Sequence, residues 1–347
     1  MKFKLFIAVL SIALLFQEVN GFAASDSLKV STIWNNGDHS AFTSLVRFKG
    51  RWYCSFREYD SHIFNAEGAA EGRVRIISSK NGRKWESVAC FGLPLCDLRD
   101  PKLSVMPDGR LMVIIGGSYY RDKKLVDRVP QVTFSRDGRN FTPPMACGVY
   151  TDFSKSPNWI WRVTWNGDTG YAVCYTQKGN DNDAFLSLVS TKDGIRYDLV
   201  RKFEFQGFPN ETTVRFLNDG RMLMAVRRDG SNSRMLWGIS EPPYTDWQFD
   251  EEDFRIGGPD FISLPDGRIL LAGRSYNEDG PRTSIWVGDV EGDFRKVIDL
   301  PSSGDCSYPG LVVKGRRLYV SYYTKPENEK NPARTEIRFA VIPLKNL

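Results

Sequence analysis

The stretch LRDPKLSVMPDGRLMVIIGG, residues 98–117, joins two apolar runs through an Asp-Gly pair. The residues on either side alternate between apolar and polar types, which is typical of strands with one buried face. Asp-Gly readily adopts the positive φ angles that a tight hairpin turn requires. The stretch therefore predicts a β-hairpin with its turn at Gly109.

The same hairpin pattern occurs six times along the chain. The other copies are HSAFTSLVRFKGRWYCSFRE (39–58), NWIWRVTWNGDTGYAVCY (158–175), NETTVRFLNDGRMLMAVRRD (210–229), GGPDFISLPDGRILLAGRSY (257–276) and CSYPGLVVKGRRLYVSYY (306–323). The turn glycines, which lie 47 to 59 residues apart, are Gly50, Gly109, Gly167, Gly220, Gly267 and Gly315. A period near 50 residues with two hairpins per unit is typical of a four-stranded sheet repeated around an axis. The sequence thus predicts an all-β, six-bladed β-propeller.

A second motif recurs between the hairpins. SKNGRKW (79–85), SRDGRNF (135–141) and TKDGIRY (191–197) share the form Ser/Thr-x-Asp/Asn-Gly-x-x-aromatic. The short polar side chain tightens a turn, and we expect the aromatic ring to pack between neighbouring sheets. These segments are Asp boxes (BNR repeats) with a structural role, and degenerate copies are predicted to end at Trp247 and Phe294.

The N-terminus predicts export. Two lysines precede an apolar run, LFIAVLSIALLF, that is too short to span a bilayer, and small residues follow it. We therefore expect a signal peptide over 1–23, a single propeller domain over 24–347, no membrane span, and a periplasmic or extracellular location. The net charge of +5 is too small and too dispersed to indicate a nucleic-acid partner. The six cysteines are irregularly spaced with no CxxC, which favours buried thiols over zinc ligands, although Cys90 and Cys96 are close enough in sequence to form a disulfide.

The first residues of each inner strand should reach one mouth of the propeller channel. In chain order these are His39, Arg99, Asp100, Trp161, Arg162, Glu211, Pro259, Asp260 and Tyr308. The residues that close the second strands add Arg57, Arg227, Arg228 and Arg274. Because a guanidinium binds a carboxylate through two parallel hydrogen bonds, this group of arginines predicts an anionic substrate, held without a metal or cofactor.

Six blades, Asp boxes and this order of residues resemble the sialidase (neuraminidase) superfamily over nearly the whole predicted mature chain. SYPGL, around Tyr308, is similar to the segment of the sialidase nucleophile, and Glu211, sixteen residues before Arg227, is similar to its activating glutamate. The resemblance implies that Tyr308 attacks the anomeric carbon, that Glu211 takes its proton, and that arginines hold the substrate carboxylate. Arg57 in CSFRE and Arg282 in GPRTSIWVGD match further arginine positions of the family.

Two features depart from the sialidase pattern. The family's Arg-Ile-Pro motif is missing: His39-Ser40-Ala41-Phe42-Thr43 stands in its place, and Arg99 or Arg162 is the candidate substitute. The acid/base residue should lie between Arg57 and the first Asp box, where four residues compete: Asp60, His62, Glu67 and Glu71. Histidine titrates near neutral pH, so His62 is the catalytic candidate and His39 a substrate-binding one.

These residues predict a secreted glycosidase of the sialidase-like clan that acts on an acidic or acid-decorated glycan, with sialic acid as the substrate that the resemblance implies. A polysaccharide lyase is an alternative, in which tyrosine and histidine remove the proton beside a uronate carboxylate. A carbohydrate-binding propeller without catalysis is another.

Overall fold

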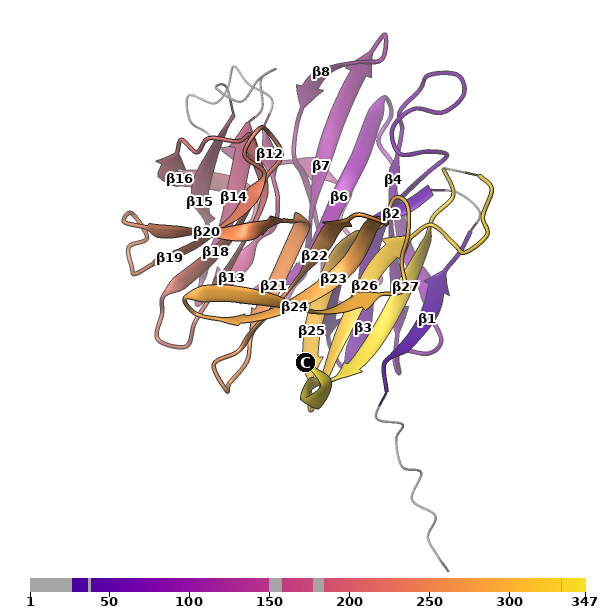
Figure 1. The fold of residues 1–347 in the computed structure, drawn as a ribbon. Helices are drawn as coiled ribbons and strands as arrows, with labels where there is room; N and C mark the ends of the chain where they lie inside the picture. The colour runs from indigo at the N-terminus through magenta and orange to yellow at the C-terminus, as the bar shows by residue number, and fades with distance from the viewer. Residues whose placement is uncertain (1–26, 37–38, 150–157, 177–183, 332) are drawn as a thin grey trace, which may run out of the picture.

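The computed structural model describes residues 27–36, 39–149, 158–176, 184–331 and 333–347, so the predicted signal peptide lies outside the described residues. The described chain forms six sheets arranged around a central axis (Figure 1). No helix in the described ranges is long and apolar enough to cross a membrane.

The first three blades follow one another from residue 39 onward. Blade 1 contains β2 (His39–Phe48), β3 (Arg51–Tyr59), β4 (Arg73–Ser79) and β5 (Glu86–Phe91). Blade 2 contains β6 (Cys96–Val105), β7 (Leu111–Arg121), β8 (Lys124–Arg128), β9 (Gln131–Ser135) and β10 (Met145–Ala146). Blade 3 contains β11 (Gly148–Val149), β12 (Trp159–Ile160), β13 (Thr164–Asn166), β14 (Thr169–Thr176), β15 (Phe185–Thr191) and β16 (Arg196–Phe203).

The last three blades are four-stranded. Blade 4 contains β17 (Pro209–Phe216), β18 (Met222–Arg228), β19 (Arg234–Ser240) and β20 (Gln248–Arg255). Blade 5 contains β21 (Gly257–Ser263), β22 (Ile269–Asn277), β23 (Gly280–Asp289) and β24 (Gly292–Leu300). Blade 6 contains β25 (Ser307–Lys314), β26 (Arg317–Thr324), β27 (Glu336–Pro343) and, from the other end of the chain, β1 (Lys29–Trp34); a short 3-10 turn, Leu344–Asn346, follows β27.

The ring closes between the first and last blades. The inner strand β2 contacts both β6 and β25, while β21 contacts β25 and β17. β1 pairs antiparallel with β27, with Lys29 opposite Val341 and Thr32 opposite Arg338. The six sheets stay separate, and their radial arrangement leaves only short, protected inner edges around the channel. The predicted six-bladed β-propeller is confirmed.

The six predicted hairpin turns all form between the first and second strands of the blades. Each turn glycine has a positive φ, from +57° at Gly167 to +93° at Gly220. In the Asp boxes, the Ser or Thr hydroxyl accepts from the glycine N–H, as in the 2.9 Å bond from Gly82 to Ser79. The side-chain oxygen of the Asn or Asp then accepts from the backbone N–H two residues later. An example is the 2.8 Å bond from the Arg139 N–H to Asp137 Oδ1.

Each Asp box packs against the preceding blade. In the first box Trp85 lies against Phe339 of blade 6 with ring centroids 5.3 Å apart, and in the degenerate fifth Phe294 lies 4.9 Å from Trp237 of blade 4. The degenerate copy that ends at Trp247 places Tyr244, with φ +68°, where the other boxes have glycine, and Tyr244 packs 5.3 Å from Tyr171 of blade 3. The boxes therefore join neighbouring blades, as predicted.

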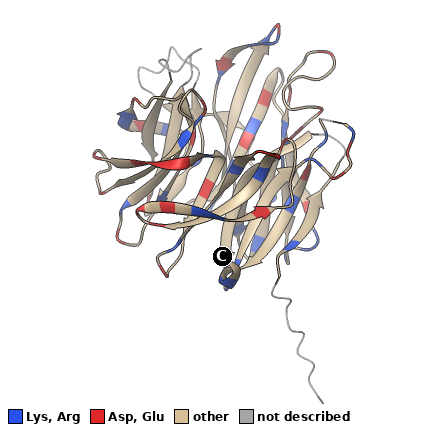
Figure 2. Ribbon diagram, in the orientation of Figure 1, with Lys and Arg blue, Asp and Glu red and all other residues tan. Residues whose placement is uncertain are grey.

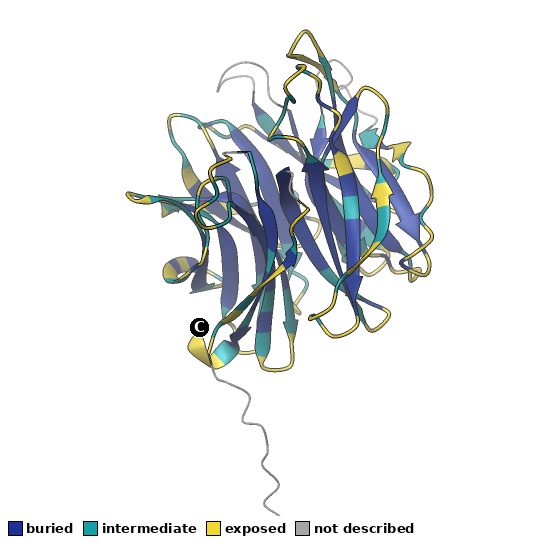
Figure 3. Cartoon of the chain, turned by 90° about the vertical axis from the view of Figure 1, so that its right-hand side faces the viewer, coloured by how far each residue is buried: buried dark blue, intermediate teal, exposed yellow. Residues whose placement is uncertain are grey.

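The hydrophobic core is divided among the interfaces between blades. One cluster joins Met112 and Ile114 of blade 2 to Ala172 and Val189 of blade 3, and similar clusters join the other neighbours. Figure 3 shows buried residues along the strands and exposed residues at the turns. All six cysteines are free thiols, with Cys90 exposed and the others buried, in agreement with the interpretation from their spacing.

Candidate functional site

An irregularity in the inner strands builds one mouth of the channel. In five blades the register between the first and second strands slips near the start of the first strand, and residues in these slips include Phe42, Asp100, Asn210, Gly258 and Tyr308. Four of them have positive φ: +65° at Phe42, +47° at Asp100, +57° at Gly258 and +50° at Tyr308. A bulge re-aims the side chains around it. The repeated bulge thus brings side chains from different blades to one place.

Tyr308 and Glu211 meet at this mouth. The Tyr308 hydroxyl donates to Glu211 Oε1 at 2.7 Å. Arg227 Nη1 lies 2.6 Å from Glu211 Oε2 and donates to the Tyr308 hydroxyl at 3.3 Å. The backbone N–H of Gly258 also donates to Glu211 Oε2, at 2.9 Å. A carboxylate held at both oxygens, with one facing the phenol, is arranged to accept the phenolic proton.

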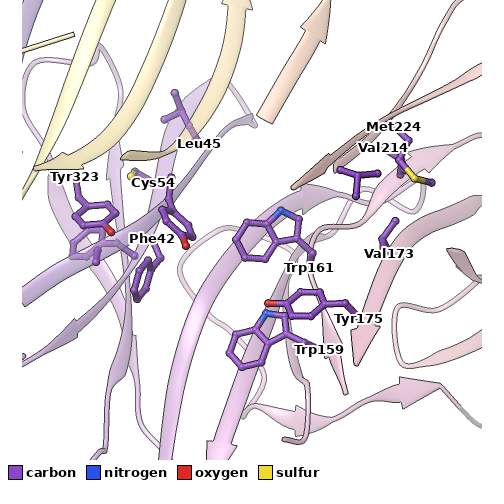
Figure 4. Packing of buried hydrophobic residues seen from close by; sticks show 14 of the residues in the cluster. Phe42, Leu45, Cys54, Trp159, Trp161, Val173, Tyr175, Val214, Met224 and Tyr323 are labelled. Atoms are coloured by element: carbon purple, nitrogen blue, oxygen red, sulfur yellow. The ribbon is translucent and has the colours of Figure 1, made fainter. Parts of the chain in front are cut away.

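The surroundings of Tyr308 are aromatic and cationic. Its ring contacts Phe42 and Trp161 at centroid distances of 5.1 and 5.9 Å. Burial and the negative charge of Glu211 raise the pKa of Tyr308 well above its usual value, while the guanidinium groups of Arg227 and Arg274 oppose that rise. Figure 4 shows Phe42 and Tyr323 on one side of this region and Trp159, Trp161 and Tyr175 on the other. Tyr308 is therefore neutral until a base removes its proton.

A pocket of about 270 Å³ opens beside the Tyr308–Glu211 pair. The predicted residues that line it are His62, Arg99, Asp100, Glu211, Arg227 and Tyr308. Residues from outside the predicted set also line it, among them Tyr120, Arg128, Trp159, Tyr175, Phe208 and Asp229. This size and this mixture of aromatic and charged groups suit a sugar ring.

Asp100 is the pocket carboxyl with the most unusual environment. It is 7% exposed, and its Oδ1 atom is buried without a hydrogen-bond partner. Burial raises its pKa, although Lys102 and Arg99 oppose the rise. A carboxyl whose pKa is raised by burial is suited to protonating a leaving group.

The two histidines converge on a single carboxylate that sequence reasoning did not single out. His39 Nε2 and His62 Nδ1 lie 2.9 and 2.7 Å from Asp305 Oδ2. Asp305 Oδ1 accepts from the Tyr323 hydroxyl at 2.6 Å and from Arg274 Nη2 at 3.1 Å. Burial opposes the shift, but the hydrogen bonds of His39 and His62 and the charge of Arg274 lower the pKa of Asp305 far below its usual range.

His39, His62 and Asp305 are also the described residues best placed to hold a metal ion, since their ligand atoms lie within 4.8 Å of one another. Two features of the group disfavour a cation. The Arg274 guanidinium already binds the same carboxylate, and the Nδ1 atom of His39 is buried with no acceptor for the proton it would carry as a ligand. The arrangement is better explained by an aspartate that orients two histidines than by a metal site.

Four predicted site residues lie outside the pocket. His39 is 1% exposed and lies behind His62. Arg57 is fully buried and binds Asp97 at 2.7 Å, and Arg162 binds Asp260 at 3.1 Å deeper in the channel. Arg282 lies on β23, the third strand of its blade, and pairs with Asp279 at 2.7 Å.

Of the four acid/base candidates in the loop after Arg57, only His62 lines the pocket. Asp60, Glu67 and Glu71 are exposed, and Glu71 accepts a backbone hydrogen bond from Leu95 at 3.1 Å. A second arginine beside Tyr308, after Arg227, is Arg274, whose guanidinium carbon lies 5.3 Å from the centre of the Tyr308 ring. The signal in the sequence that could have identified Arg274 is its position near the end of the second strand of its blade.

Comparison with known proteins connects this geometry to a fold. No protein-family model and no curated protein matches the sequence. Among solved structures, a protein of unknown function from Dyadobacter fermentans DSM 18053 aligns with a TM-score of 0.77 at 17% identity, over 90% of this chain and 98% of its own. An α-L-arabinanase of Penicillium chrysogenum complexed with arabinobiose aligns with a TM-score of 0.68 at 15% identity, over 91% and 98%.

A sialidase of Trypanosoma rangeli in complex with the inhibitor DANA aligns with a TM-score of 0.64 at 13% identity. The chain has the sialidase-like propeller fold. The alignment covers 88% of this propeller but 55% of the sialidase, so the chain corresponds to about half of that protein. Identities this low establish the fold, and the activity has to be argued from the site.

Proposed function

We propose that this propeller is an exported glycoside hydrolase in which Tyr308 is the nucleophile. The observation that carries the proposal is the 2.7 Å hydrogen bond from the Tyr308 hydroxyl to Glu211, at the wall of a sugar-sized pocket. The neighbouring fold relatives named as arabinanase and sialidase support a glycan substrate. Export follows from the predicted signal peptide.

The reaction proceeds in two displacements. In the first, the Tyr308 oxygen bonds to the anomeric carbon, its proton passes to Glu211, and Asp100 gives its proton to the departing glycosidic oxygen. In the second, Asp100 takes a proton from water, the water oxygen displaces Tyr308, and Glu211 returns the phenolic proton. The anomeric configuration is retained because two inversions occur. Arg227, 3.3 Å from the phenolic oxygen, stabilises negative charge that develops there.

A sialic acid glycoside is one of the substrates that this proposal allows. Its carboxylate would require guanidinium groups near Tyr308, yet Arg227 is shared by Glu211 and Asp229, and Arg274 binds Asp305. Phe42 belongs to the segment that replaces the family's Arg-Ile-Pro motif, and it faces the Tyr308 ring. An α-L-arabinofuranoside, which has no carboxylate, is therefore tested beside the sialoside.

The proposal is tested with a panel of fluorogenic glycosides that includes an α-sialoside and an α-L-arabinofuranoside. We expect one of the panel to be cleaved with retention of configuration, and Tyr308→Phe to lower kcat/KM on the order of 10,000-fold. Tyr322→Phe is the matched control, because Tyr322 is buried on the same blade and its hydroxyl donates to Pro301 away from the pocket. Equal activity of wild type and Tyr308→Phe would remove Tyr308 from the mechanism.

A polysaccharide lyase is the second candidate, because His62 shares the pocket with Tyr308 and is held by Asp305 at 2.7 Å. A lyase releases an unsaturated uronate that absorbs in the near ultraviolet and cleaves no fluorogenic glycoside. That product from a uronate polymer, lost in both His62→Ala and Tyr308→Phe, would replace the hydrolase assignment.

A further inference from the structure

Among the described residues that line the pocket, one arginine has no acidic partner. Three arginines line it: Arg99, Arg128 and Arg227. Arg99 binds Asp97 at 3.0 Å, and Arg227 binds both Glu211 and Asp229. Within the described ranges the side chain of Arg128 makes no ion pair and no side-chain hydrogen bond, and its Nε and Nη1 atoms are buried without an acceptor.

The environment of Arg128 makes the missing partner costly. Its guanidinium lies over Trp159, 5.4 Å from the ring, and the indole Nε1 of Trp159 is also buried without an acceptor. Buried donors are nearly always satisfied in folded proteins, and each one left unpaired lowers stability. Arg128 therefore has no acceptor among the described residues of the pocket wall, and its charge is available to an anionic ligand.

The hairpin that carries Arg128 has further basic residues beyond the pocket. β8 is an additional strand paired with the end of β7, and the hairpin that they form projects beyond the neighbouring strands (Figure 1). The segment RDKKLVDR, residues 121–128, has four basic and two acidic residues, and Figure 2 shows basic residues at the hairpin tip. Tyr120 of this hairpin also lines the pocket. The hairpin, with two more basic than acidic residues over 121–128, thus starts at the pocket wall.

We propose that Arg128 binds an anionic substituent of the glycan, a carboxylate or a sulfate ester, and that the β7–β8 hairpin continues this contact along a charged chain. This inference rests on the proposed function and specifies its substrate class. The anion is then bound at the pocket wall formed by blades 2 and 3, and not by the arginines around Tyr308. Guanidinium suits both groups, because its N–H donors pair with two oxygens at once.

Affinity gel electrophoresis tests this binding without relying on turnover. The Tyr308→Phe protein, alone or with a second substitution, migrates through gels that contain polygalacturonate, dextran sulfate or neutral linear arabinan. We expect Arg128→Gln to weaken retention by at least one of the two anionic polymers about tenfold, and Arg128→Lys to weaken it less. Retention by arabinan should not change. Selective loss on polygalacturonate identifies a carboxylate, and selective loss on dextran sulfate identifies a sulfate ester.

Arg282→Gln is the control for net charge, because Arg282 is an arginine outside the pocket. Equal weakening by Arg128→Gln and Arg282→Gln, equal weakening on arabinan, or no retention by either anionic polymer would overturn the inference. The test separates it from the hydrolase proposal. Charge-dependent retention by a wild-type protein that cleaves no glycan overturns the hydrolase alone, and cleavage without charge-dependent retention overturns only the role of Arg128.

Discussion

Asp100 shows at the scale of one residue how the fold builds an unusual chemical environment. Its backbone lies in the left-handed region at a bulge, its carboxyl is 7% exposed, and one oxygen has no partner. A folded protein ordinarily avoids such a group, because burying a polar atom without a hydrogen bond lowers stability. Burial of the carboxyl causes both the raised pKa of Asp100 and this loss of stability.

Replacing Asp100 by Asn should therefore separate function from stability. Folding raises the pKa of Asp100 above its ordinary value of 3.8, so the folded state binds the proton more tightly and stability falls as pH rises through the interval between the two values. Asp100→Asn should be more stable than wild type at pH 7, with no gain at pH 3, while kcat/KM falls about 100- to 10,000-fold. Thermal unfolding at both pH values, beside kinetics, measures this.

The exposed residue Asp60 supplies the control, since Asp60→Asn should change neither property. In wild type, the rate should decline as pH rises through the pKa of Asp100, because the general acid must carry its proton. A rate that is unaffected by Asp100→Asn would assign the acid to another group, with His62 as the next candidate.

At the scale of elements, the bulge near the start of the inner strands is the feature that makes a site from six similar hairpins. Regular strands would alternate their side chains between the two faces of each blade. The slip in register instead directs Asp100 and Tyr308 toward the mouth, together with Glu211. The bulge of blade 5 takes part through Gly258, whose N–H binds Glu211 and whose Cα lies beneath the Tyr308 ring.

Gly258→Ala should disturb this arrangement. A Cβ atom would lie 2.8 Å from Cγ of Tyr308, and the residue has a φ of +57°. We expect a stability loss of about 1–3 kcal/mol and a large fall in kcat. Gly109→Ala is the matched control, since Gly109 has a φ of +78° but open space around its Cβ position; it should lose stability while keeping activity. Equal activity in the two variants would mean that Gly258 does not hold Tyr308 in place. Unfolding in denaturant and glycoside kinetics give both readouts.

At the scale of the whole molecule, the two ends of the chain close the ring in one blade. β1 supplies the outer strand of blade 6, and Ile33 contributes to the largest hydrophobic cluster. Removing β1 would expose the edge of β27, and unpaired edges promote association between chains. The stability of the site therefore depends on residues that lie far from it in sequence.

A chain that begins at residue 37 should accordingly be less stable than one that begins at residue 24. We expect its Tm to fall by more than about 10 °C, because the β1–β27 ladder and the packing of Ile33 are lost. It should also form soluble aggregates. Differential scanning calorimetry and light scattering after gel filtration measure the two effects, and equal Tm values for the two chains would show that β1 is dispensable for closure.

The six hairpins and the Asp boxes were predictable because their determinants are local. Asp-Gly or Asn-Gly turns, alternating flanks and a Ser-x-Asp-Gly segment determine the backbone within a few residues, whatever lies around them. Tyr308 and Glu211 were also named from sequence, through family-like segments, although 97 positions separate them.

Only the tertiary structure decided which charged residues line the pocket. Arg57 and Arg282 match family segments, yet Arg57 is buried against Asp97 and Arg282 lies on the third strand of its blade, paired with Asp279. Arg128 matches no motif and lines the pocket without a counterion. The reason is physical: a hairpin is determined by neighbours in the chain, whereas the burial and pairing of a charge depend on groups brought from other blades by the closed ring.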